Sequence, residues 1–117
     1  MADTLQIDYI EFYSPDLEAT QAFFSRAFGW EFVDYGPDYR DIQGAGTGGG
    51  LERSAPKAPL IVLKADDLEA ACQQVRAAGA EMTTGIFDFP GGRRFEFRAP
   101  GGIAIAVWSE NPAAATS

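Results

Sequence analysis

The stretch that decides the fold is SPDLEATQAFFSRAFGWEF at Ser14–Phe32, and it has a counterpart, ADDLEAACQQVRAAGAEM, at Ala65–Met82. The tetrapeptide DLEA occurs in both, at Asp16–Ala19 and at Asp67–Ala70, 51 positions apart. Each copy follows a stretch of β type, carries apolar residues at helical spacing and then reaches a glycine. The match predicts an internal repeat in which each copy is a helix between strands.

Aromatic and β-branched stretches predict eight strands around these helices. The predicted strands are Leu5–Tyr13, Trp30–Gly36, Tyr39–Gly46 and about 50–54, then Leu60–Ala65, Ala80–Phe89, Arg93–Ala99 and Ile103–Glu110. The sequence therefore predicts an α+β fold of two tandem βαβββ modules. One helix covers one face of four strands, so the other face needs cover from the sister module. We expect a curved mixed sheet with a central ligand trough.

A chain of 117 residues suits a single domain. We expect module one at about 5–54, module two at about 59–110 and a frayed tail at 111–117. Ser14 is the expected cap of the first helix, with Pro15 at its first position. Asp66 is the expected cap of the second helix.

The net charge of −8 argues against nucleic-acid binding and against a basic patch for anionic membranes. No stretch approaches the roughly 20 apolar residues that span a bilayer, and the first residues do not resemble a signal peptide. The one cysteine, Cys72, excludes an intrachain disulfide. We therefore expect a cytoplasmic protein that binds neither nucleic acid nor membrane.

The chain has no histidine. This removes the usual general base at neutral pH, the commonest metal ligand and any Ser-His or Cys-His nucleophile pair. A thiolate zinc site is excluded as well, because there is one cysteine. A glycine-rich loop, GAGTGGG at Gly44–Gly50, is not a phosphate loop, since no Lys-Ser or Lys-Thr follows it to open a helix.

Two stretches resemble the vicinal oxygen chelate superfamily, which holds glyoxalase I, bleomycin-resistance and extradiol dioxygenase proteins. They are EFYSPDLEATQAFFSRAFGWEF at Glu11–Phe32 and GGRRFEFRAPGGIAIAVW at Gly91–Trp108. In the second, Ala99 replaces the Asp of the family's Asp-Pro-x-Gly turn. The resemblance covers nearly the whole chain. It implies a homodimer, which edge strands such as Ile103–Glu110 also favour.

Metal-dependent relatives hold a divalent ion with His, Glu or Gln from the first and last strand of each module. The resemblance places three of these positions at Tyr9, Leu60 and Ala106, and the fourth near Glu52–Ser54. Tyrosine, leucine and alanine are not expected ligands of a neutral divalent site. The resemblance therefore implies a member with no metal and no cofactor.

Glu11 lies two residues from Tyr9 on one strand, so both should face the trough. Glu11 is either a ligand anchor, acid or base, or a structural carboxylate with a partner. The aromatic residues Phe95, Phe97 and Trp108 form either a stacking platform or core, and at least two are expected in the core. The predicted ligand-binding residues are Tyr9, Glu11, Leu60, Phe95, Ala106 and Trp108, with Glu11 alone as a catalytic candidate.

Three functions fit these residues. The first is metal-independent binding of a small apolar or aromatic molecule in the trough. The alternative is a lyase, isomerase or dioxygenase of the same fold that uses carboxylates such as Glu11, although the absence of histidine disfavours a dioxygenase iron site. The third is a structural or regulatory partner whose trough is filled by its own side chains.

Overall fold

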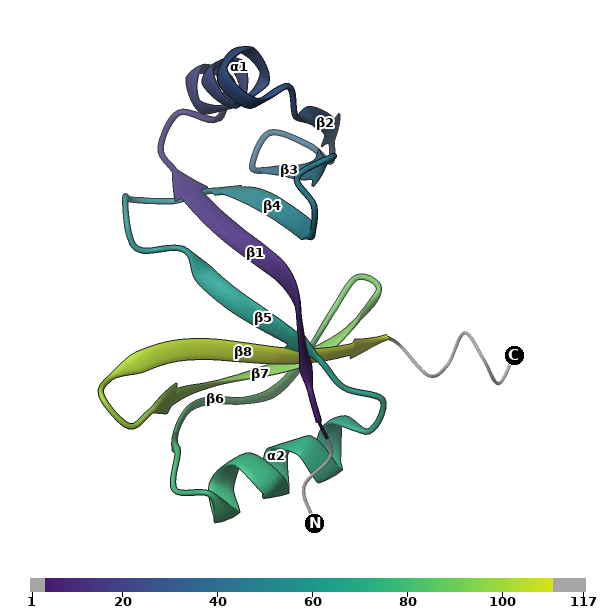
Figure 1. Cartoon of the computed structure of the whole chain (residues 1–117), viewed down its shortest axis with the longest axis vertical. Coiled ribbons are helices and arrows are strands. Elements are labelled where there is room, and N and C mark those ends of the chain that lie inside the picture. Colours follow the sequence, from purple (N-terminus) through teal and green to yellow (C-terminus); the bar gives the residue numbers. More distant parts are fainter. Residues whose placement is uncertain (1–3, 111–117) are drawn as a thin grey trace. The chain divides into compact units, whose positions relative to one another are not determined.

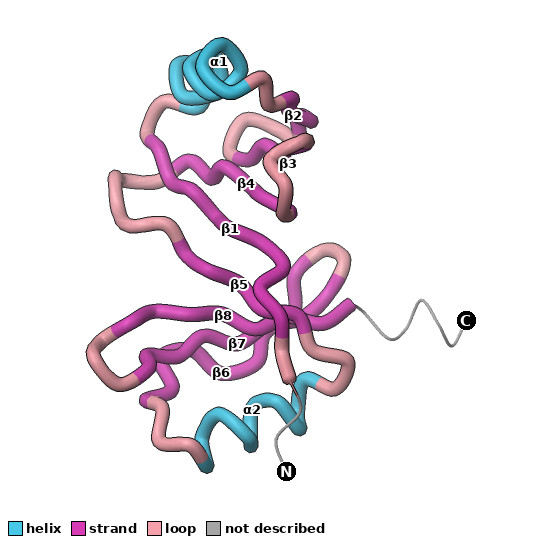
Figure 2. The backbone as a smooth tube through the Cα atoms, in the orientation of Figure 1, coloured by secondary structure: helices cyan, strands magenta, loops and turns pink. Residues whose placement is uncertain are grey.

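The computed structural model describes residues 4–110 of the chain. They form an α+β fold of two βαβββ halves, as the sequence predicts (Figure 1). By its contacts the chain divides into two compact units, residues 8–60 and residues 61–110 with the segment before residue 8. Each unit has one helix beside its strands (Figure 2). The predicted tail at 111–117 lies outside the described residues.

The first unit places its strands in the order β2-β3-β4-β1. Its elements are β1 (Gln6–Ser14), α1 (Leu17–Phe28), β2 (Glu31–Asp34), β3 (Tyr39–Gln43) and β4 (Gly48–Arg53). The pairs β2–β3 and β3–β4 are antiparallel, whereas β4 runs parallel to β1. The sheet is therefore mixed, and its two longest strands lie next to each other.

The second unit repeats this arrangement, with the strand order β5-β8-β7-β6. Its elements are β5 (Leu60–Lys64), α2 (Leu68–Ala77), β6 (Glu81–Phe89), β7 (Gly92–Ala99) and β8 (Ile103–Glu110). The expectation that Ile103–Glu110 is an edge strand is wrong, because β8 pairs with both β5 and β7. The register between β6 and β7 shifts twice, on either side of Thr84.

The cap of α1 is Asp16, not Ser14 as predicted. The Asp16 carboxylate accepts a hydrogen bond from the backbone N–H of Ala19 at 3.0 Å. Ser14 instead accepts bonds from the Asp16 N–H (3.0 Å) and from the Thr20 hydroxyl (2.7 Å). Pro15 lies before the cap rather than at the first helical position. Gly29 ends the helix with a φ of 76°, a left-handed conformation that glycine adopts without strain.

The cap of α2 is Asp67, and the prediction of Asp66 is wrong by one residue. Asp67 accepts from the backbone N–H of Ala70 at 3.0 Å. The choice between adjacent aspartates depends on which one has extended backbone geometry, and Asp67 has φ −123° and ψ 101°. Both helices thus begin at the aspartate of the repeated DLEA.

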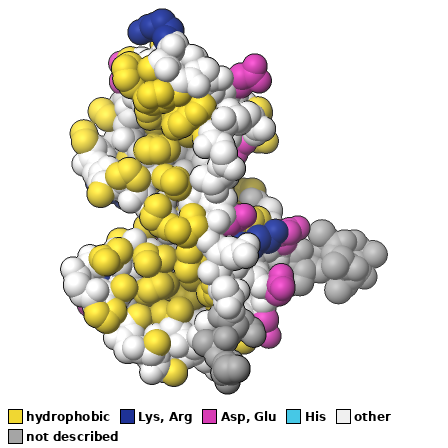
Figure 3. Space-filling model, viewed as in Figure 1, with side chains coloured by type: hydrophobic (Ala, Val, Ile, Leu, Met, Phe, Trp, Pro, Cys, Tyr) yellow, Lys and Arg dark blue, Asp and Glu magenta, His cyan; other side chains and the backbone are white. Residues whose placement is uncertain are grey.

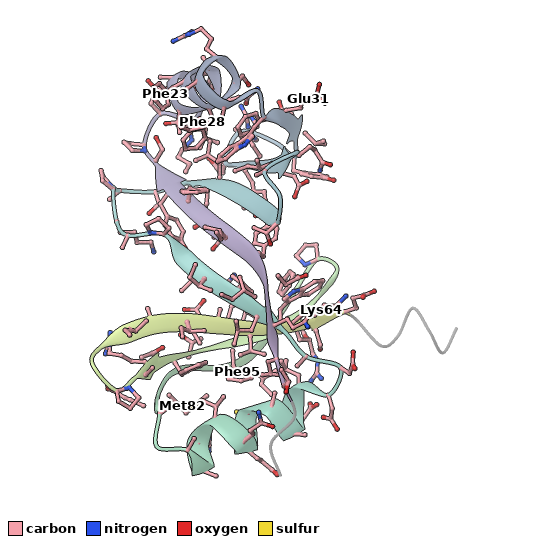
Figure 4. All side chains as sticks on the ribbon, viewed as in Figure 1. Phe23, Phe28, Glu31, Lys64, Met82 and Phe95 are labelled. Carbon is pink, nitrogen blue, oxygen red and sulfur yellow. The ribbon has the colours of Figure 1, made fainter. Side chains whose placement is uncertain are left out.

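The core of the second unit lies between its sheet and α2. Phe95, Phe97 and Val107 pack there with side chains of α2. The buried residues from α2 are Leu68, Ala71 and Cys72. Figure 4 labels Phe95 and Met82 on the side of the strands that faces α2. Cys72 is buried on this side of α2, whereas Ala78, just after the helix, is exposed.

The first unit packs α1 on its sheet through aromatic rings. The Phe24 ring lies 5.4 Å from Phe12 and 5.1 Å from Trp30 between centroids. Two other phenylalanines of α1 remain at the surface, because Phe23 is 53% and Phe28 is 55% exposed. Figure 3 shows hydrophobic side chains gathered at the surface beside α1. Within residues 4–110 there is no helix long and apolar enough to cross a membrane.

Candidate functional site

Strand alternation divides the residues of β1 between two faces of the first unit's sheet. Phe12 contacts Phe24 of α1, so the even-numbered residues of β1 face the helix. Tyr9, Glu11 and Tyr13 therefore point to the face opposite α1. Tyr9 and Glu11 share this face, as their spacing predicts.

The register brings residues of β3 and β4 to the same face. Glu11 is opposite Gly50, and Gly50 is opposite Asp41. Tyr13 aligns with Glu52, and Glu52 aligns with Tyr39. We call this surface the tyrosine face. It consists of Tyr9, Glu11 and Tyr13 from β1, Tyr39, Asp41 and Gln43 from β3, and Gly48, Gly50 and Glu52 from β4.

The hydroxyl groups of Tyr9 and Tyr39 are hydrogen-bonded to each other directly over Gly50. A Cβ atom added to Gly50 would overlap both hydroxyl oxygens. Glycine at position 50 is therefore the reason that the two phenols meet at this point. Gly50 itself is buried, while both tyrosines are half-buried.

Both phenols are harder to ionise than a free tyrosine. Burial raises the pKa of Tyr9 to about 12, with Asp41 and Glu11 adding to the rise and the bond from Tyr39 opposing it. Burial is also the main cause that raises the pKa of Tyr39, followed by its hydrogen bond to Tyr9. Both hydroxyls therefore carry their protons at neutral pH.

Glu11 is 5% exposed and lies within the tyrosine face. Its Oε1 accepts a hydrogen bond from the Tyr13 hydroxyl at 2.8 Å. The ammonium of Lys57 lies 4.2 Å from the centre of the Tyr13 ring, a cation–π contact. A phenol is thus one of the groups that hold this buried carboxylate.

The internal repeat identifies the fourth position that the resemblance marks. In the second unit Val62 is opposite Ala106. Glu11, 51 positions before Val62, is opposite Gly50. The counterpart of Ala106 is therefore Gly50, and the predicted window at Glu52–Ser54 is wrong.

The residues at these four positions do not fit a divalent metal. They are Tyr9, Gly50, Leu60 and Ala106, of which Tyr9 alone has a side-chain donor atom, a phenol that holds its proton. The space beside Gly50 is filled by the two hydroxyls. Among residues 4–110, no group of three or more His, Cys, Asp or Glu side chains is arranged to hold a metal ion.

In the second unit, Ala106 and Trp108 lie on the face opposite α2, because the alternating Val107 packs toward the helix. The Trp108 ring is 6.2 Å from the Phe89 ring between centroids, and the Lys64 ammonium is 5.2 Å from the Trp108 ring. This face therefore offers a half-buried aromatic surface, with the Lys64 ammonium already in contact with it.

Phe95 does not belong to that surface, so its prediction as a ligand-binding residue is wrong. It is 0% exposed and packs in the core beside α2. Leu60 is 8% exposed and Ala106 is 0% exposed. These two side chains can therefore contribute only to the wall of a binding site. The structure brings Tyr9 and Glu11 together in one unit and Ala106 and Trp108 together in the other.

Sequence reasoning missed Tyr39 and Asp41. The signal was the alternation of Tyr39, Asp41 and Gln43 along their strand. That alternation identifies one face but does not identify the neighbouring strand. The pairing of β3 with β4, and of β4 with β1, is what places these residues beside Tyr9 and Glu11.

A hollow of about 290 Å³ lies between α1 and the strands β2 and β3. It is lined by Glu18, Gln21, Ala22, Ser25, Phe32, Asp34 and Arg40. The Arg40 guanidinium donates to the Gly36 carbonyl (2.6 Å), to Gln21 (3.1 Å) and to Glu18 (3.3 Å). These bonds make Arg40 a cross-link between the helix and the strands rather than a ligand-facing cation.

Comparisons with known proteins agree with this fold. The Glyoxalase/Bleomycin resistance protein/Dioxygenase superfamily matches residues 6–107. No curated protein sequence matches the chain significantly. A Mn(II)-bound glyoxalase from Novosphingobium aromaticivorans is similar at 26% identity and a TM-score of 0.70, over 89% of this chain. This chain spans 38% of that protein's length.

Two further structures share the fold at lower identity. A superfamily member from Vibrio splendidus is 20% identical with a TM-score of 0.69, over 92% of this chain and 100% of that one. Methylmalonyl-CoA epimerase from Mycobacterium tuberculosis is 18% identical with a TM-score of 0.70, over 100% of this chain and 97% of that one. With a sequence match over residues 6–107 and the two βαβββ halves, the chain belongs to the Glyoxalase/Bleomycin resistance protein/Dioxygenase superfamily.

Proposed function

We propose that this protein binds a small, largely apolar or aromatic molecule without a metal ion or other cofactor. One observation carries the proposal, namely the residues Tyr9, Leu60 and Ala106 at three positions that the family resemblance marks for ligands, together with Gly50, the counterpart of Ala106 in the internal repeat. None of them supplies the imidazole or carboxylate that a divalent ion prefers. The aromatic contact of Trp108 with Phe89 supports a planar or apolar ligand.

The experiment is native mass spectrometry of the purified chain together with elemental analysis after dialysis. We expect well under one metal per chain and, where a ligand co-purifies, a mass increment that disappears on denaturation. Stoichiometric nickel, zinc, iron or manganese that survives dialysis contradicts the proposal.

A second candidate function is acid–base catalysis by Glu11 in a lyase, isomerase or dioxygenase of this fold. The observation that favours it is the burial of Glu11 beside the Tyr13 hydroxyl. Glu11→Gln keeps the shape and removes the charge. Turnover that is lost in this variant while ligand binding remains supports catalysis, whereas equal loss of both supports binding alone.

We also propose a cytoplasmic homodimer that binds no nucleic acid. The support is the single cysteine, the net charge of −8 and the exposed phenylalanines Phe23 and Phe28 on α1. Light scattering at micromolar concentration should give twice the chain mass of 12.6 kDa. A monomer mass across the whole concentration range contradicts the dimer.

A further inference from the structure

We propose that the outer face of α1 is the contact surface between two copies of this chain, which lie antiparallel about a two-fold axis near Ala22. The helix belongs entirely to the first unit. Its outer face consists of two rows of exposed residues at helical spacing, Glu18, Ala22 and Arg26 beside Ala19, Phe23 and Ala27. This inference rests on the proposed homodimer and names the surface through which it forms.

The exposed side of α1 is largely apolar. Eight residues of this helix are exposed, and five of them are apolar, namely Ala19, Ala22, Phe23, Ala27 and Phe28. The rings of Phe23 and Phe28 lie edge to face with 5.9 Å between their centroids, and Figure 4 labels both residues on α1. Both rings are more than half exposed, so together they form an apolar patch of the kind that marks an interaction surface.

The internal repeat shows that folding does not require an aromatic residue on this side. At the position in α2 that corresponds to Phe23, 51 residues later, the chain carries Gln74. The next position packs toward the sheet in both helices and is apolar in both, as Phe24 and Val75. The side that packs on the sheet is therefore alike in the two helices, whereas the outer side is aromatic in α1 alone. A contact outside the unit accounts for this difference.

The charges at the two ends of the outer face select a second copy in antiparallel orientation. Glu18 lies in the first turn and Arg26 in the last, eight residues or about 12 Å apart along the axis. A two-fold axis midway between them brings each Arg26 to the partner's Glu18, whereas parallel copies would bring like charges together. Glu18 also pairs with Arg40, but its side chain is still 71% exposed, so a second cation can reach it.

Small side chains allow the two helices to approach each other. Ala19, Ala22 and Ala27 lie around Phe23, and helices pack at about 8–10 Å depending on the side chains between them. A helix of 12 residues is about 18 Å long, so the contact is smaller than the roughly 800 Å² per partner of a standard interface. We therefore expect a reversible dimer that dissociates on dilution.

The first test replaces Phe23 by the residue type that α2 has at the same place. Sedimentation velocity of the full chain over a dilution series gives the Kd of the dimer. Phe23→Gln should raise this Kd roughly tenfold or more, because the aromatic centre of the contact is lost. Tyr35→Gln is the matched control and should leave the Kd unchanged, since Tyr35 is an aromatic residue that is 67% exposed and lies outside α1.

The second test reverses one end of the charge pattern at a time. Arg26→Glu places two carboxylates opposite each other at both ends of the contact, and Glu18→Lys places two cations there. Each variant alone should raise the Kd roughly tenfold or more. An equal mixture of the two restores opposite charges at both ends, so a mixed dimer should form with an affinity near that of the wild type. Arg26→Met should have a smaller effect, because an exposed ion pair contributes little.

The outcomes separate this surface from the homodimer itself. A dimer whose Kd is unchanged in Phe23→Gln or in Arg26→Glu overturns the surface and leaves the homodimer standing. Charge variants that weaken the dimer but do not associate when mixed overturn the antiparallel orientation. A monomer at every concentration of the wild type overturns both proposals. If Glu18→Lys fails to fold by circular dichroism, Phe23→Gln and Arg26→Glu decide the question of the surface without it.

Discussion

Asp16 and Asp67 stand 51 positions apart and cap α1 and α2 through the same hydrogen bond, a carboxylate that accepts at 3.0 Å from the N–H three residues later. Asp16→Ala and Asp67→Ala should each lower the free energy of unfolding by about 1 kcal/mol, because an N–H of the first turn loses its partner. Urea denaturation measures the loss. Asp66→Ala is the matched control, with the same charge change beside the cap, and a larger loss there would contradict the assignment.

The raised pKa of Tyr9 predicts a loss of stability in alkali. A free tyrosine titrates near 10, whereas burial raises the pKa of Tyr9 in the folded chain to about 12. Between these values the folded chain holds more protons than the unfolded chain, so the free energy of unfolding falls as pH rises. Denaturation series from pH 9 to 12 should show a steeper fall in the wild type than in Tyr9→Phe. Tyr35→Phe serves as the control and should follow the wild type.

Substitution by alanine should lower the stability of the fold by different amounts at two glycines, Gly92 and Gly50. At Gly92 an added Cβ meets the backbone carbonyl of Ser109 on the paired strand, which moves only if the ladder is disturbed. At Gly50 it meets the tips of two tyrosine side chains, which can rotate. Gly92→Ala should therefore cost about 1–3 kcal/mol of stability, and Gly50→Ala less.

Gly85→Ala is the control for this pair, since nothing lies within 4 Å of the added atom. It should be neutral or slightly stabilising, because alanine restricts the unfolded chain more than glycine does. Thermal denaturation of the three variants ranks them. The reverse order for Gly50 and Gly92 would show that the tyrosines are the more rigid neighbours.

Arg40 should be important for stability rather than for binding. Its side chain is 9% exposed and makes an ion pair with Glu18 at 3.3 Å and a bond to the Gly36 carbonyl at 2.6 Å. Arg40→Met should lower the free energy of unfolding by about 2–3 kcal/mol, because these charge-assisted bonds are lost. Arg40→Lys should recover little of it, since one ammonium does not reproduce the fork of donors.

The control for Arg40 is Arg26→Met, which removes the same charge from the exposed last turn of α1. It should change stability by less than about 0.5 kcal/mol. Equal effects of the two substitutions in urea denaturation would mean that the bonds of Arg40 contribute nothing beyond its charge.

The repeat, the order of elements and the fold class could be predicted, because periodicity and the DLEA match are local properties of the sequence. The helix caps could not, since Ser14 and Asp16, like Asp66 and Asp67, are both acceptable cap residues and only the backbone geometry selects one. These errors moved each helix start by two residues or fewer.

The candidate site could be predicted only in part. Alternation along one strand placed Tyr9 beside Glu11, but Tyr39 and Asp41 require the register of two neighbouring strands. Alternation also put Phe95 on one face without showing that this face meets α2. The fourth position was missed because 41 positions separate Tyr9 from Gly50, whereas 46 separate Leu60 from Ala106.

The overlap at Gly50 has a consequence for how this sequence can change. A longer side chain introduced at position 50, including a metal-binding one, meets the hydroxyls of Tyr9 and Tyr39 before it can serve any purpose. Those two tyrosines would have to rotate away or be replaced, and either change takes from the neighbourhood of Glu11 the phenols that burial has kept protonated. The effect of a substitution at Gly50 therefore depends on the residues at positions 9 and 39. A series of single substitutions from this chain to a metal-binding one begins with the loss of the phenol pair.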